Sequence, residues 1–270
     1  MSAALIAAVL ALCACQASPG PVPLPSAAPG WIPALPATNE ALSRVLVAAA
    51  RGGMQSAWTP DGDERFRGYL ATLAWRGPSS HPELYPSTDD LLAFLVDAHI
   101  AWALALGHAA TLAGRDVASL REQPFVVDGR TSSLRLLSEE IAWRAASEPR
   151  LALVLNAGWR GGPPLPAVAI EGRSLAWQLA MQADRCGRLA GFWQVDTASK
   201  RLSVSAFTEL MWGLPASQPA RARRLLDLVP PPAELRVRIV AACGASLQRC
   251  AIALSPVDTG RMFTPERPHR

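Results

Sequence analysis

Residues 148–166, E-P-R-L-A-L-V-L-N-A-G-W-R-G-G-P-P-L-P, place an unbroken apolar run directly before a turn rich in glycine and proline. The run, residues 151–155, is shorter than most helices and is bracketed by turn residues, so we predict a strand buried on both faces. The glycines allow unusual backbone angles and the prolines fix φ, so the turn has a defined shape. Turns of this kind often carry functional groups. This one holds no nucleophile, acid or base, and its candidate ligand-facing side chains are Asn156, Trp159 and Arg160.

Length and composition indicate one large folded domain, alone or with a small appendage, and the expected elements place it in the α+β class, rich in helices around a small sheet. The chain has 270 residues, of which 50% are hydrophobic and 18% charged, enough to bury a large core. We place this domain at residues 38–254 and expect a loose tail over residues 255–270. The net charge of +4 comes from basic residues scattered along the chain without a nucleic-acid motif. The sequence therefore predicts no nucleic-acid partner.

The first residues predict export and a lipid anchor. Residues 1–15, M-S-A-A-L-I-A-A-V-L-A-L-C-A-C, form a short apolar run that ends in small residues, as a secretory signal does. Its last four residues resemble a lipobox, with Cys15 as the acylated cysteine, and Gln16 in the next position fits sorting to the outer membrane. Residues 16–37 are rich in proline and read as an extended tether. We expect a lipoprotein of the bacterial cell envelope that faces the periplasm. The competing interpretation is a frayed apolar N-terminus on a cytosolic protein.

Export makes a disulfide between two of the remaining cysteines plausible. Cys243 and Cys250 are seven residues apart, which on one continuous helix would separate them by about 10 Å. They can pair only if Gly244 opens a turn.

The longest apolar segment, residues 91–113, predicts a helix capped by Ser87 or Thr88. We interpret it as a buried central helix, because Asp97 near its middle would cost about 2.5 to 3.5 kcal/mol in a bilayer. A transmembrane helix is the alternative, since the length suffices. Asp97 and His99 are candidate ligand-facing residues, but they lie two positions apart and point to nearly opposite sides. They cannot form a dyad.

Periodicity and turn residues predict the remaining elements. The expected helices are residues 40–51, 64–75, 134–143, 174–189, 207–212 and 220–228. The expected strands, besides residues 151–155, are residues 124–128, 192–195, 202–205, 236–239 and 251–254, with the last two placed side by side.

The motifs on either side of the glycine turn resemble the family called domain of unknown function 547. Its members read D-P-R-I-H-F-A-L before a Cys-containing turn and S-C-P-P-L, where this chain has E-P-R-L-A-L-V-L and G-P-P-L. Upstream, L-A-F-L-V-D-A-H-I-A at residues 92–101 resembles the family's L-A-F-W-I-N-A-Y-N-A. A further motif, S-L-x-x-I-E-H, falls on residues 133–139. The resemblance covers most of residues 65–215.

The resemblance implies hydrolase-like chemistry on a papain-like or transglutaminase-like fold, but the reactive residues of the family are replaced. Its His and two Cys fall on Ala152, Ala157 and Gly162, and the Glu-His pair falls on Ser138 and Glu139. We therefore expect a pseudoenzyme, without cofactor or metal, that binds an unknown protein or small molecule. The competing hypothesis is a hydrolase whose nucleophile has moved to Cys186, where Arg185 and Arg188 favour the thiolate.

Overall fold

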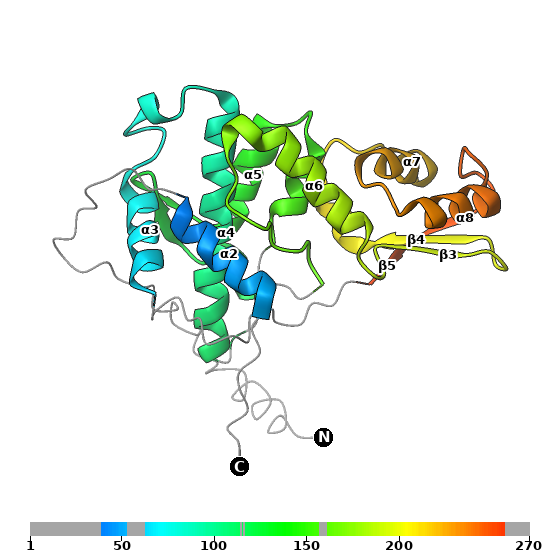
Figure 1. Cartoon of the computed structure of the whole chain (residues 1–270), viewed down its shortest axis with the longest axis horizontal. Helices are drawn as coiled ribbons and strands as arrows, with labels where there is room; N and C mark the ends of the chain where they lie inside the picture. Colours follow the sequence, from blue (N-terminus) through cyan, green and yellow to red (C-terminus); the bar gives the residue numbers. More distant parts are fainter. Residues whose placement is uncertain (1–38, 53–62, 114, 116, 157–160, 257–270) are drawn as a thin grey trace, which may run out of the picture.

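The computed structural model describes residues 39–52, 63–113, 115, 117–156 and 161–256 (Figure 1). The helices are α2 (Glu40–Gly52), α3 (Glu64–Trp75), η1 (Pro82–Leu84), α4 (Thr88–Leu112), η2 (Val117–Glu122), α5 (Leu134–Arg144), η3 (Pro149–Val154), η4 (Gly172–Ser174), α6 (Leu175–Gly187), η5 (Ala206–Leu210), α7 (Gln218–Leu228) and α8 (Ala233–Cys243). The strands are β1 (Phe125–Val127), β2 (Arg130–Ser132), β3 (Trp193–Asp196), β4 (Arg201–Ser205) and β5 (Ala251–Ser255). The fold is a helix-rich α+β domain with small sheets of two and three strands, as the sequence predicts.

The centre of the fold is α4, whose 25 residues begin at a reciprocal capping box. The hydroxyl of Ser87 accepts from the backbone N–H of Asp90 at 3.1 Å, and the Asp90 carboxylate accepts from the N–H of Ser87 at 3.2 Å. By length and composition α4 could cross a membrane, but 89% of its apolar window is buried inside the domain. This burial supports the interpretation as a central core helix.

The first core cluster surrounds α4. Figure 1 shows α4 upright, with α2, α3 and α5 beside it. Strands β1 and β2 form an antiparallel pair in which Phe125 faces Ser132. The ring of Phe125 stacks on Trp102 of α4, with centroids 4.8 Å apart, and this contact ties the small sheet to the central helix.

The prediction of a buried strand at residues 151–155 is wrong. The residues are all buried, but the segment from Pro149 to Val154 is the 3₁₀ helix η3. Glu148 begins it, because its carboxylate accepts from the N–H of Arg150 at 3.1 Å and Pro149 fits the first helical turn. A short apolar run is compatible with a buried strand and with a buried helical segment. Neither of the two small sheets includes residues 151–155.

The second core cluster lies under α7, α8 and the three-stranded sheet, which Figure 1 shows together at one end of the molecule. The hairpin of β3 and β4 is present as predicted. The strand expected at residues 236–239 is instead part of α8, and β5 pairs in parallel with β4. Ser255, expected in the loose tail, is the last residue of β5 and lies opposite Ser205.

The wrong prediction in α8 has a clear cause. The sequence R-V-R-I alternates like an edge strand, but the residues that reach the core recur at helical spacing, namely Leu235, Ile239, Ala242 and Cys243. Pro232 precedes the helix and Gly244 ends it with φ +74°. This turn brings Cys243 and Cys250 to a Cα–Cα distance of 4.8 Å, and the two form a disulfide.

Candidate functional site

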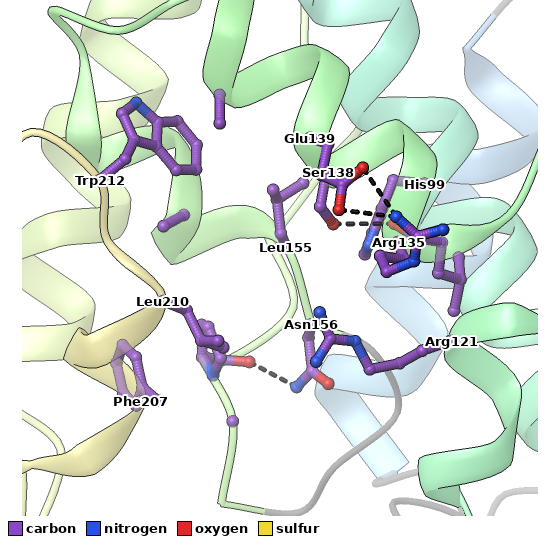
Figure 2. A pocket seen from close by; sticks show the side chains of 15 residues that line it. His99, Arg121, Arg135, Ser138, Glu139, Leu155, Asn156, Phe207, Leu210 and Trp212 are labelled. Atoms are coloured by element: carbon purple, nitrogen blue, oxygen red, sulfur yellow. Dashed lines mark hydrogen bonds and ion pairs between the residues drawn. The ribbon is translucent and has the colours of Figure 1, made fainter.

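A cavity of about 230 Å³ lies where the two core clusters meet (Figure 2). Two elements belong to both clusters: α6 begins with Leu175 in the first and ends with Cys186 in the second, and η3 divides its residues between them. We call the cavity the His99 pocket. Its walls are His99, Arg121, Leu134, Arg135, Ser138, Glu139, Ala142, Ala152, Leu155, Asn156, Gly162, Pro163, Phe207, Leu210 and Trp212.

Apolar side chains form most of the walls. One face of α5 supplies five of the residues, because Leu134, Ser138 and Ala142 recur every fourth position and so lie along one side of the helix. Figure 2 shows Phe207, Leu210 and Trp212 on the opposite side of the pocket from Arg135. The indole N–H of Trp212 donates to the carbonyl of Ala145 at 2.9 Å, which fixes the ring against the end of α5.

His99 enters the pocket from the middle of α4 and is only 1% exposed. Its Nδ1 is enclosed by protein and has no hydrogen-bond partner in the described structure. Burial, and next the positive charge of Arg121, lower the pKa of His99 to about 4. The ring is therefore neutral near pH 7. Because Nδ1 is enclosed, the only polar atom that the ring can offer to the pocket is Nε2.

Two arginines line the pocket, and they differ in their partners. The guanidinium of Arg135 is held by two carboxylates, at 2.8 Å from Glu122 and 2.7 Å from Glu139. Arg121 makes no hydrogen bond or ion pair with any described residue. Figure 2 shows its side chain extending into the interior of the pocket. Arg121 is thus a half-buried positive charge that has no counter-charge among the described residues.

Asn156 closes the floor of the pocket at the end of η3. It is 2% exposed, and its Nδ2 donates to the carbonyl of Pro163 at 2.6 Å. A Cβ at Gly162 would lie 3.1 Å from this Nδ2, so glycine lets the turn approach the amide closely. Asn156, predicted to face a ligand, lies in the wall of this pocket. Trp159 and Arg160 lie outside the described residues, as do Ala157 and Cys15.

Asp97 does not line the pocket. Its Oδ1 accepts from the backbone N–H of Ile170 at 2.8 Å, which ties the chain before η4 to α4. Its Oδ2 is buried without a partner among the described residues, and burial raises the pKa of this carboxyl well above its usual value. Asp97 and His99 therefore have separate environments, as their spacing predicts.

Cys186 does not resemble an activated nucleophile. It is fully buried in the second core cluster, and burial raises the pKa of its thiol to about 12 despite the opposing charge of Arg185. The expectation that neighbouring arginines favour the thiolate is wrong, because desolvation outweighs them. In the described part of the chain the thiol has no hydrogen bond to a histidine.

The other polar groups of the pocket are engaged elsewhere. The hydroxyl of Ser138 donates its hydrogen to the carbonyl of Leu134 at 2.8 Å. Glu139 is bound to Arg135. Across the described residues, no three His, Cys, Asp or Glu side chains are placed to hold a metal ion. The chemistry that this arrangement offers is recognition through Arg121, the neutral ring of His99 and apolar walls.

Sequence reasoning missed most of the pocket. No motif marks Arg121, Phe207, Leu210 or Trp212. They meet His99 only because α4, η2, and η5 with the residues that follow it converge in space. The available signal was indirect: the predicted resemblance assigns reactive groups to Ser138, Glu139, Ala152 and Gly162, and to Ala157, which lies outside the described residues.

Comparison of the chain with protein-family models finds no match, and comparisons with curated proteins and with solved structures find none either.

Proposed function

We propose that this protein is an exported, lipid-anchored protein of the bacterial cell envelope whose domain binds a small molecule in the His99 pocket without converting it chemically. The observation that carries the proposal is the pocket itself. It combines apolar walls with a half-buried arginine that has no partner in the described structure and a fully buried neutral histidine. Pockets of this composition are typical ligand sites, because a few polar groups orient a ligand that apolar walls hold.

The resemblance to the domain of unknown function 547 family supports this location. Ser138, Glu139, Ala152 and Gly162 were matched to reactive positions of the family from sequence alone. Ser138 and Glu139 are neighbours on α5, Ala152 is in η3 and Gly162 lies in the turn that follows, and all four line the same pocket. The proposal is therefore that the protein keeps the site of a hydrolase-like ancestor while its reactive groups have been replaced.

The disulfide between Cys243 and Cys250 supports export. Such bonds persist in oxidising compartments and are rare in the bacterial cytosol. The alternative of a hydrolase with Cys186 as nucleophile has less support, because the thiol is buried away from the pocket walls and its pKa is raised.

A screen of small apolar and aromatic fragments by protein-observed NMR tests the proposed function. We expect hits that shift the indole resonance of Trp212 and the backbone resonances of residues around His99. The variant Ala142→Phe places an aromatic ring inside the pocket and should remove at least 90% of the shift, on the order of a tenfold loss of affinity or more.

The matched control is Ala176→Phe, which adds the same ring to an exposed position on α6. This variant should bind the fragments as the unmodified protein does. The proposed function is wrong if no fragment in a broad set perturbs the pocket, or if Ala142→Phe folds normally and binds every hit unchanged.

A further inference from the structure

We propose that the ligand of the His99 pocket is a small monocarboxylic acid with an apolar or aromatic body, whose carboxylate contacts Arg121 and whose body lies against Phe207, Leu210 and Trp212. This inference rests on the proposed function, because it names the chemical class of the ligand for that site.

The charges of the pocket favour an anion. Arg121 has no counter-charge among the described residues, and a partly buried guanidinium gains most from a carboxylate, which can accept two parallel N–H bonds. The carboxylates of Glu139, in the wall, and of Glu122, next to Arg121 in the sequence, do not fill this role. Both bind Arg135, and their side chains are 59% and 63% exposed, so they are solvated. A cationic ligand would be repelled by the positive charge of Arg121.

The ring of His99 adds a second donor. A buried N–H without an acceptor is rarer in proteins than an acceptor without a donor, so the enclosed Nδ1 is assigned the lone pair and Nε2 carries the hydrogen. This tautomer presents a neutral N–H to the pocket. Arg121 and His99 thus offer donors without offering acceptors, which suits a carboxylate and disfavours an ammonium group, and the charge of Arg121 favours the anion over a neutral acceptor.

The single positive charge of Arg121 and the size of the cavity restrict the chemical class of the ligand further. One unpaired guanidinium balances one negative charge, whereas a dianion would be left with an uncompensated charge among apolar walls. The volume of about 230 Å³ is below the range of roughly 300 to 1,000 Å³ that is usual for drug-sized ligands, so the acid is small. The aromatic walls of Phe207 and Trp212 suit a flat ring or a short branched chain.

Three probes of similar shape and different charge test the inference: benzoate, the neutral benzamide and the cationic benzylamine. We measure their dissociation constants by NMR titration of the full folded domain at neutral pH. Benzoate should bind at least tenfold more tightly than either of the other two, as expected for a charge-assisted hydrogen-bonded pair.

Arg121→Gln should weaken the binding of benzoate about tenfold or more and leave the affinity for benzamide unchanged, so that the two probes bind with similar affinity. Arg121→Lys keeps the charge but loses the bidentate geometry, so its affinity for benzoate should lie between those of the unmodified protein and Arg121→Gln. The matched control is Arg173→Gln, since Arg173 is 85% exposed and lies outside the pocket wall, and it should leave all three affinities unchanged.

The outcomes separate the two proposals. If benzamide or benzylamine binds as tightly as benzoate and Ala142→Phe abolishes the binding, the pocket is a ligand site but the acid class is wrong. If benzoate is preferred but Arg121→Gln does not reduce the preference, the assigned carboxylate contact is wrong. If no probe perturbs the pocket, the acid class is overturned, and the proposed function falls as well when the broad fragment set also fails.

Discussion

At the scale of single residues, the buried ionisable groups of α4 illustrate how position on a helix separates neighbours in sequence. Asp97 and His99 are both 1% exposed, yet Asp97 bonds the backbone at Ile170 and His99 lines the pocket. Desolvation acts on both in the direction that favours the neutral form: it raises the pKa of the acid and lowers that of the base. The sequence identifies such residues as candidates, but it does not show which of them faces a cavity.

His99 makes the stability of the protein depend on pH. Its folded-state pKa of about 4 is below the ordinary 6.5, so between these values the unfolded chain binds a proton that the folded chain does not. Stability is therefore fully present above pH 6.5 and is lost as the pH falls towards 4. From pH 7 to pH 5 the loss from this residue is about 2 kcal/mol.

Urea unfolding of the unmodified protein and of His99→Gln at several pH values measures this effect. On going from pH 7 to pH 5, the free energy of unfolding of the unmodified protein should fall by about 2 kcal/mol relative to that of His99→Gln. Parallel pH profiles for the two proteins would show that His99 does not keep a lowered pKa in the folded state.

At the scale of elements, the sequence located most helices correctly because their ends carry strong local signals. Asp63 begins α3, Ser87 begins α4 and Ser133 begins α5, each with a side chain that accepts a backbone hydrogen bond. The errors fall where the local signal is ambiguous. Residues 151–155 are apolar throughout. Residues 236–239 alternate between charged and apolar side chains by chance, within a helix whose buried face includes Leu235 and Ile239.

The turn after α8 supplies a prediction at this scale. The disulfide of Cys243 and Cys250 closes a loop of about eight residues and restricts the unfolded chain, so the double variant Cys243→Ser, Cys250→Ser should lose about 2.5 kcal/mol of unfolding free energy. Urea unfolding measures the loss. Dithiothreitol should lower the stability of the unmodified protein by a similar amount and leave the double variant unaffected. Equal sensitivity of both proteins to the reductant would contradict the assignment.

At the scale of the whole molecule, the pocket lies where the two core clusters meet, beside η3, whose residues belong to both clusters. Residues at the junction come from α4, η2, α5, η3 and η5, so the site depends on the packing of segments that are far apart in sequence (Figure 2).

Localisation is also a property of the whole chain, and we expect attachment to a membrane through Cys15. Radiolabelled palmitate should be incorporated into the full-length protein expressed in a bacterium with a lipoprotein export pathway. The Cys15→Ala variant should incorporate less than about a tenth of the label, because the lipobox cysteine is the acylated residue of such signals. Equal labelling of the two proteins would refute the anchor.

The sequence by itself determined the helix-rich α+β class, the capped central helix, the hairpin of β3 and β4, and the condition under which Cys243 and Cys250 could pair. These features depend on local pattern: side-chain periodicity, capping groups and a glycine where a turn needs positive φ. Only the tertiary structure decided that residues 151–155 form a 3₁₀ helix, that Cys186 is an inert buried thiol, and that Arg121 and Trp212 share a pocket with His99. The physical reason is that desolvation and packing depend on which distant segments surround a residue, and no local pattern encodes those neighbours.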